Sequence, residues 1–158
     1  MVLAAEGDDD IEHEDLFATS DADQSSWEPL EAAPGIRVEL QPARAQVWAS
    51  ARNISRWLAA NPHAVAGKRV LELGAGTGLP SIVCAKLGAA AVSGTNVDPA
   101  AIEALSLCAA RNGLDTTLRS ELLDWTRYLG ADRRPHDPLP PEVTLAADCN
   151  YEPKLVPA

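Results

Sequence analysis

The residues best suited to chemistry lie in one short segment, where a glutamate and three glycines alternate with other residues. Glu72, Gly74, Gly76 and Gly78 come at the end of an apolar run that starts at Val70. Glycine lets a backbone turn sharply and approach a ligand, because a Cβ at Gly74 or Gly76 would occupy the ligand's space. The segment therefore predicts a strand that leads into a cofactor-binding turn.

Two common phosphate-binding patterns fit this turn poorly. A dinucleotide fingerprint would have its third glycine at position 79, where this chain has Leu79. A nucleoside triphosphate loop would continue with Gly-Lys-Ser/Thr, but Gly78 is followed by Leu79 and Pro80. S-Adenosylmethionine fits better, because its sulfonium and amino acid groups contain no phosphate and need no lysine.

The elements that must position this turn alternate between strands and helices. Helix stop signals occur at Asn61-Pro62 and Gly88, and Asp98-Pro99 is a typical helix start. The patterns predict strands at 34–40, 68–73, 91–95, 116–122 and 143–147, and helices at 43–60, 79–87 and 100–111.

This alternation predicts an α/β fold with a Rossmann-like, doubly wound, mostly parallel sheet and helices on both faces. In such sheets ligands bind at the carboxyl ends of the strands. The expected strand ends carry the turn at 74–78, Asn96, Asp124 with Trp125, and the segment 148–151. We therefore expect a single crevice there.

Charge divides the chain of 158 residues and net charge −10 into two parts. Residues 1–36 contain 11 of the 23 acidic residues and no lysine or arginine, so we expect an acidic, disordered tail. A solubilising role for it is favoured over contact with basic partners. Residues 37–158 are close to neutral and form the expected domain, which has no basic stripe for nucleic acid.

Composition sets further limits. The hydrophobic content of 46% is enough for one domain core, and no apolar run approaches 18 residues. The N-terminus lacks a secretion signal, so we expect a soluble, cytoplasmic or nuclear monomer without a membrane partner. The three cysteines, Cys84, Cys108 and Cys149, have spacings that suit neither disulfides nor a metal site.

Several motifs together resemble a known family. They are Gln46–Ala51, the glycine turn with Leu79–Val83, Leu123-Asp124-Trp125 and Ala146–Tyr151. In this order they resemble the seven-stranded, class I S-adenosylmethionine-dependent methyltransferases. Within that class they resemble the protein-lysine methyltransferases that modify translation factors and chaperones, a group once called nicotinamide-methyltransferase-like. The resemblance spans roughly residues 37–158.

The resemblance implies a set of cofactor-binding residues. Trp48 would wall the pocket, Glu72 would orient the methionine end, and the backbone of Gly74, Ala75 and Gly76 would pass beneath the cofactor. Asn96 would bind the ribose. The remaining implied residues are Asp124 and Trp125 beside the adenine and Ala147 lining the pocket.

The resemblance also implies the catalytic residues. Asp148 and Tyr151 match the family's Asp-x-x-Tyr after the fourth strand, and would hold and polarise a lysine ammonium. The ammonium must lose a proton before its lone pair attacks the methyl group. The implied function is S-adenosylmethionine-dependent protein-lysine N-methylation, with no metal.

Two features depart from the family pattern. The family usually has an acid where this chain has Asn96, and an amide accepts hydrogen bonds without charge assistance, so we expect weaker cofactor binding. The chain also ends seven residues after Tyr151, whereas the family continues with three more strands. We expect a C-terminally incomplete sheet of about four core strands, with the fourth strand as an exposed edge.

Other functions remain as alternatives. A small-molecule N-methyltransferase shares the fold and the turn, and a catalytically inactive methyltransferase-like binding protein would agree with Asn96 and the missing strands. Methyltransferases that act on adenine or glutamine have two prolines where this chain has Cys149 and Asn150. Hydrolase chemistry is disfavoured, because Ser81 lacks a nucleophile-elbow context.

Overall fold

The computed structural model describes residues 27–41, 47–125 and 140–147. Its centre is a four-stranded sheet in the order β5 (Leu118–Leu122), β4 (Ala91–Asn96), β3 (Arg69–Leu73) and β6 (Val143–Ala146). Every neighbouring pair in this sheet is parallel. The predicted Rossmann-like parallel sheet is therefore confirmed, and β6 is an outer strand of the described sheet.

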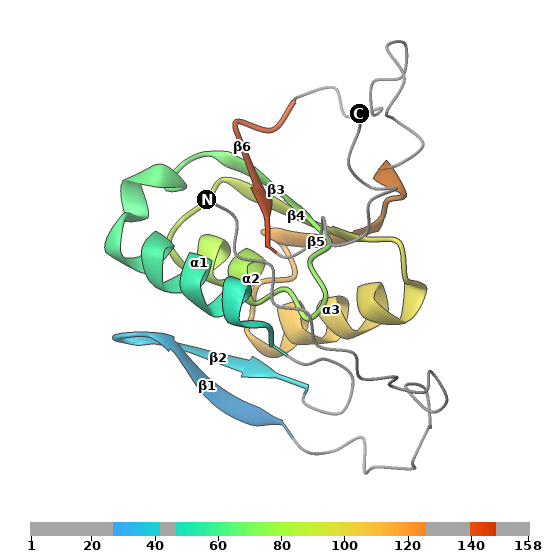
Figure 1. Cartoon of the computed structure of the whole chain (residues 1–158), viewed down its shortest axis with the longest axis horizontal. Coiled ribbons are helices and arrows are strands. Elements are labelled where there is room, and N and C mark those ends of the chain that lie inside the picture. Colours follow the sequence, from blue (N-terminus) through green and yellow to red (C-terminus); the bar gives the residue numbers. More distant parts are fainter. Residues whose placement is uncertain (1–26, 42–46, 126–139, 148–158) are drawn as a thin grey trace, which may run out of the picture.

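Three helices cover one face of the sheet: α1 (Ala49–Ala60), α2 (Leu79–Lys86) and α3 (Pro99–Arg111). Figure 1 shows them between the sheet and a two-stranded hairpin. A short 3-10 helix, η2 (Pro62–Ala64), follows α1. The fold prediction also includes helices on the second face; the described residues contain none there, and residues 126–139, between β5 and β6, lie outside the described part of the chain.

Local signals place the helix ends. The Asp98 carboxylate accepts the Ala100 N–H at 2.9 Å and caps α3, as its position before Pro99 predicts. Helix α1 begins later than the expected Ala43: Trp48 has an extended backbone with φ −66° and ψ 153°. Val47, just outside the helix, packs against the core, so the apolar pattern continued beyond the helical residues.

The hairpin corrects part of the expected acidic tail. Residues 28–33 form β1 (Glu28–Ala33), which pairs antiparallel with β2 (Ile36–Leu40). Ala32 and Ala33 of β1 and Val38 and Leu40 of β2 are buried. The high number of acidic residues in 1–36 concealed these apolar positions. Their contacts with the core offset the conformational entropy that is lost when the strand becomes ordered. Residues 1–26 of the expected tail lie outside the described residues.

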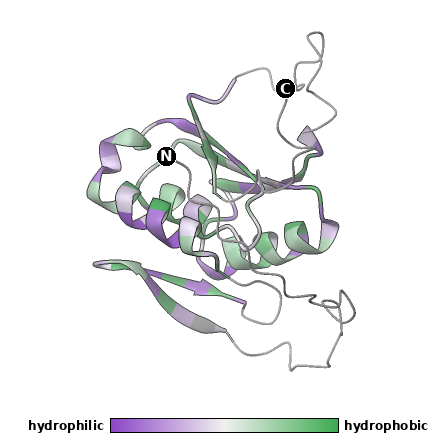
Figure 2. Cartoon of the chain, viewed as in Figure 1, coloured by the Kyte–Doolittle hydropathy of each residue, from purple (hydrophilic) through white to green (hydrophobic). Residues whose placement is uncertain are grey.

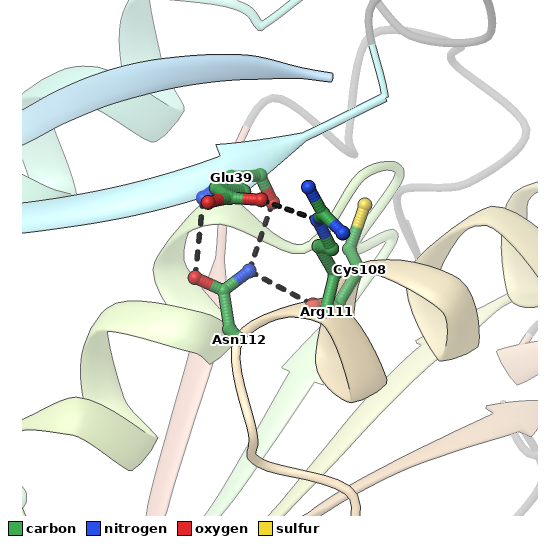
Figure 3. A network of polar contacts seen from close by, with 4 residues as sticks. All are labelled: Glu39, Cys108, Arg111 and Asn112. Atoms are coloured by element: carbon green, nitrogen blue, oxygen red, sulfur yellow. Dashed lines mark hydrogen bonds and ion pairs between the residues drawn. The ribbon is translucent and has the colours of Figure 1, made fainter. Parts of the chain in front are cut away.

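A polar clasp joins the hairpin to the end of α3 (Figure 3). The Asn112 side chain accepts the Glu39 N–H at 3.1 Å and donates to the Glu39 carbonyl at 2.8 Å. Its amide also donates to the Cys108 carbonyl, and Arg111 forms an ion pair with the Glu39 carboxylate. The Arg111 guanidinium lies 5.6 Å from the Trp27 ring centroid, within cation–π range.

The hydrophobic core lies between the sheet, the helices and the hairpin. Its largest fully buried side chains include Leu58 of α1, Ile82 of α2 and Leu105 of α3. Figure 2 shows that α3 is hydrophobic along most of its length, whereas hydrophilic residues recur around α1. Among the described residues, no helix is long and apolar enough to cross a membrane.

Candidate active site

The parallel sheet brings four chain segments to one edge. The carboxyl ends of β3, β4, β5 and β6 lead into the turn at 74–78, Asn96, residues 123–125 and Ala147, respectively. The Ala75 N–H donates to the Thr95 carbonyl at 2.8 Å, and the Leu123 N–H donates to the Asn96 carbonyl at 2.9 Å. These bonds extend the order of the sheet into the loops, as a rigid ligand crevice requires.

The three glycines of the turn all have positive φ, but for different physical reasons. Gly74, Gly76 and Gly78 have φ values of 66°, 54° and 74°. A Cβ at Gly76 would meet no heavy atom within 4 Å, so the space beside this residue is open. A Cβ at Gly78 would lie 2.1 Å from Leu105 Cδ1. Gly76 thus leaves room for a ligand, and Gly78 leaves room for the core.

Glu72 lies on β3 just before the turn and is almost fully buried, with 1% of its surface exposed. Its Oε2 accepts hydrogen bonds from the Ser81 N–H, at 2.9 Å, and from the Ser81 hydroxyl. Desolvation by burial raises the pKa of Glu72 to about 7, and the two bonds from Ser81 oppose that rise. The described contacts of the Glu72 carboxylate are therefore with α2.

Asn96 ends β4 at the same edge of the sheet. Its Oδ1 accepts the Asp98 N–H at 3.0 Å, so its amide nitrogen is oriented as the remaining hydrogen-bond donor. Asp98 is engaged as the cap of α3, in agreement with the role its position before proline favours. A ribose at this position would therefore meet an amide group instead of a carboxylate.

The other predicted residues differ in their exposure. Asp124, Trp125 and Ala147 are half-buried at the carboxyl edge, whereas Trp48, just before α1, is 58% exposed. Asp148 and Tyr151, the predicted catalytic pair, lie outside the described residues. The described residues include no group of three or more His, Cys, Asp or Glu side chains that could hold a metal ion.

Three residues at this edge were not predicted from the sequence as site residues. Ser81 and Thr95 are buried and bonded to Glu72, and Val97, directly after Asn96, is an apolar side chain that is 61% exposed. The position of Val97, directly after the polar residue that ends β4, is a sequence signal for an apolar wall of the site. Ser81 belongs to the Leu79–Val83 motif of the resemblance, but no local pattern indicates that its hydroxyl binds back to the strand.

A family model described as lysine methyltransferase matches residues 39–158, which is more than half of the chain. The chain belongs to the lysine methyltransferase family. This confirms the resemblance that the motifs indicate. The family's methyl donor is S-adenosylmethionine, and the open space at Gly76 fits a ligand that passes close to the backbone.

Several curated proteins are similar to this chain. Protein-lysine N-methyltransferase EFM3 of Chaetomium thermophilum is 31% identical over 118 residues, which are 72% of this chain and 35% of that protein. The electron transfer flavoprotein beta subunit lysine methyltransferase of Rattus norvegicus is 40% identical over 68 residues, 43% of this chain and 27% of its own length.

A third relative is the protein N-terminal and lysine N-methyltransferase efm7 of Schizosaccharomyces pombe, 48% identical over 60 residues, 37% of this chain and 24% of that protein. The chain therefore spans about a quarter to a third of the length of these relatives. Among solved structures, Arabidopsis thaliana protein arginine methyltransferase 10 matches with a TM-score of 0.48 and 22% identity, over 61% of this chain and 26% of that one.

Proposed function

We propose that this chain is the cofactor-binding part of an S-adenosylmethionine-dependent protein-lysine N-methyltransferase. Family membership supports the reaction class, and the names of the similar proteins describe enzymes that modify proteins. The observation that carries the proposal is the glycine turn at the end of β3. There, the positive φ of Gly76 and the open space beside it provide room for a ligand against the backbone.

The bound cofactor supplies an electrophilic methyl group on a sulfonium sulfur. The residues of this chain bind and align it, and alignment accounts for most of the rate gain in such a transfer. In this proposal the backbone of Gly74–Gly76 lies against the methionine end. The amide nitrogen of Asn96, whose carbonyl already binds the Asp98 N–H, donates to a ribose hydroxyl.

The adenine would lie among apolar and aromatic side chains. Val97 is exposed beside Asn96, and Asp124 and Trp125 follow β5 at the same edge. A carboxylate at Asp124 suits the exocyclic amine of adenine, and the Trp125 ring suits its face. Trp48 would become covered when the cofactor binds, which gives its exposed surface a function.

Asp148 and Tyr151 complete the proposal as the acceptor side of the site. A carboxylate and a phenol there would hold the substrate lysine, which loses its proton to solvent before the neutral amine attacks the methyl carbon. The C–S bond breaks as the N–C bond forms. A translation factor or chaperone as substrate, a cytoplasmic monomer, and the absence of nucleic acid or membrane partners belong to the same proposal.

Calorimetric titration of the whole chain with S-adenosylmethionine tests the cofactor assignment. We expect wild type to bind, and Gly76→Ala and Asp124→Ala each to weaken binding at least tenfold. Gly67→Ala is the matched control, because Gly67 has a similar φ of 71°, nothing within 4 Å of a Cβ, and a position before β3, at the opposite end of that strand. Equal binding by Gly76→Ala and Gly67→Ala would contradict the assignment.

A second experiment tests the acceptor. The chain is incubated with cell extract and methyl-labelled cofactor, and labelled proteins are digested and examined by mass spectrometry. We expect methylated lysine in the products, and loss of label with Asp148→Asn. Label on arginine, on a small molecule, or on nothing despite cofactor binding would exclude lysine methylation by this chain.

A further inference from the structure

Helix α2 begins without a capping side chain of its own. Its N-cap residue is Gly78 in the left-handed region, and no side chain caps the helix from that position. Glycine suits this position, because its φ of 74° strains other residues and a Cβ would lie 2.1 Å from Leu105 Cδ1. The first backbone N–H groups of a helix need acceptors from elsewhere. Here the Ser81 N–H, in the first turn, donates to Glu72 Oε2 at 2.9 Å.

Glu72 therefore caps α2 from the preceding strand, and the Ser81 hydroxyl adds a second bond to the same oxygen. Ser81 is fully buried. On the other side, the Thr95 hydroxyl donates to the Glu72 carbonyl at 2.7 Å, and the Thr95 carbonyl accepts the Ala75 N–H. The residues before, within and after the glycine turn are thus joined through Glu72, Thr95 and Ser81.

Among the described residues, the elements next to Glu72 carry few charged groups. Strands β4 and β6, which flank β3, have no titratable side chains within 91–96 and 143–146. Helix α2 contributes exposed Lys86 and buried Cys84, whose pKa burial raises to about 12, so its thiol is neutral at pH 7. Ser81 is thus the principal group in the described residues that favours the carboxylate, while desolvation favours the protonated acid.

We propose that Ser81 is a positioning residue for the cofactor site, which holds the Glu72 carboxylate at the start of α2, and that cofactor binding at the adjacent turn releases the Glu72 proton to solvent. The inference rests on the proposed function, since it takes S-adenosylmethionine as the ligand of the turn. The turn starts at Gly74, two residues after Glu72. A positively charged ligand bound there would favour the ionised form of Glu72. Near pH 7 both forms of Glu72 are populated before the ligand binds.

Calorimetry of the whole chain between pH 6 and 8.5, in buffers of different ionisation enthalpy, counts the released protons. We expect the affinity of wild type to rise three- to tenfold more over this range than that of Glu72→Gln, with net proton release at pH 7. The cofactor's own ammonium titrates equally in both proteins. Glu142→Gln, an exposed acid at the opposite end of the sheet, should behave as wild type.

The ligand provides a second comparison. S-Adenosylhomocysteine differs from S-adenosylmethionine in lacking the sulfur-bound methyl group and having a neutral sulfur, so we expect it to release fewer protons from wild type. Equal release with both ligands would show that the sulfonium does not act on Glu72. The same proton release from Glu72→Gln as from wild type would overturn the inference.

Ser81→Ala separates positioning from a purely structural role. We expect its affinity to be about threefold lower than wild type at pH 7 and to converge with wild type at pH 8.5, because the profile moves to higher pH. Ser55→Ala, the loss of an equally buried hydroxyl on α1, is the control. An equal loss at every pH would contradict positioning through Glu72. Binding without proton linkage would overturn only this inference, whereas no binding by the folded chain would overturn the proposed function too.

Discussion

Two polar networks tie this chain together, and they differ in their access to water. Glu72 and Ser81 are fully enclosed where β3 meets α2, whereas Glu39 and Arg111 of the hairpin clasp keep 42% and 53% of their side-chain surfaces exposed (Figure 3). A buried polar group that loses its partner has no replacement, but an exposed one is solvated again. The buried network therefore determines the local structure of the site, and the clasp only adds to the attachment of the hairpin.

The largest loss of stability is expected at Gly78, where the buried region around the glycine turn is most closely packed. Gly78→Ala would place a Cβ against Leu105. The Leu105 side chain is also close to Gly94, because a Cβ at Gly94 would lie 2.5 Å from Leu105 Cδ2. Overpacking costs about 1–3 kcal/mol and a left-handed alanine about 1–2. We expect the free energy of unfolding, measured with urea, to fall by about 3–4 kcal/mol.

Gly67→Ala controls for the cost of placing alanine in the left-handed region. Gly67 also has a positive φ, and a Cβ there would meet no heavy atom within 4 Å. Its loss should be about 1–2 kcal/mol. If the two variants lost equal stability, Leu105 would have moved aside without cost, and close packing would not explain Gly78.

The pH dependence of stability gives the next effect. The pKa of Glu72 is raised from 4.5 to about 7 on folding, so the folded chain binds more protons than the unfolded chain between these values. Stability from this group is complete below pH 4.5 and is lost as pH rises through 7. The loss amounts to about 3 kcal/mol at 1.4 kcal/mol per pKa unit.

Urea unfolding of wild type and Glu72→Gln at several pH values from 4.5 to 8 isolates this term, since the other groups titrate in both proteins. The stability of wild type relative to Glu72→Gln should fall steadily as pH increases. A difference that is constant with pH would mean that Glu72 keeps its ordinary pKa in the folded chain.

Two fully buried serines sharpen the comparison further. The Ser81 hydroxyl binds the Glu72 carboxylate, whereas the Ser55 hydroxyl on α1 has no hydrogen-bond partner among the described residues. Ser81→Ala should cost about 2 kcal/mol, because it leaves a buried carboxylate with one bond fewer. Ser55→Ala should be neutral or stabilising by up to about 1 kcal/mol, since alanine also favours the helix. Thermal unfolding of both variants measures the difference, and equal losses would refute it.

The sequence predicted the sheet because its signals are local. Gly88 and the Asp98-Pro99 cap separate strands from helices, and alternating strands and helices lead to a parallel sheet. The prediction of a disordered tail is wrong for residues 28–33. This strand is ordered by its pairing with β2, which follows it in the chain, and by the core that it shares with the helices.

The site was predictable only in part, because its motifs do not reveal which atoms face one another. Gly76 and Gly78 are equivalent in the motif, yet one lies beside open space and the other against Leu105. The partner of Glu72 lies nine residues away, across the turn, and only the folded chain brings the Ser81 hydroxyl to it. The resemblance supplied ligand roles, while the contacts that position the turn came from the structure.

The smallest effects are expected in the clasp, and they separate hydrogen bonding from charge. Asn112→Ala removes bonds to both backbone groups of Glu39 and to the Cys108 carbonyl, so it should cost about 1–2 kcal/mol. Arg111→Gln removes an exposed ion pair and should cost less than about 1 kcal/mol, with most of that cost abolished in high salt.

Hydrogen exchange of the β2 amides would report on the same change, with faster exchange in Asn112→Ala than in Arg111→Gln. If Arg111→Gln were the more damaging variant, the cation–π contact with Trp27 would hold the hairpin more strongly than the Asn112 bonds do. In that case, an exposed contact would contribute as much to the free energy of unfolding as we expect only from a buried network.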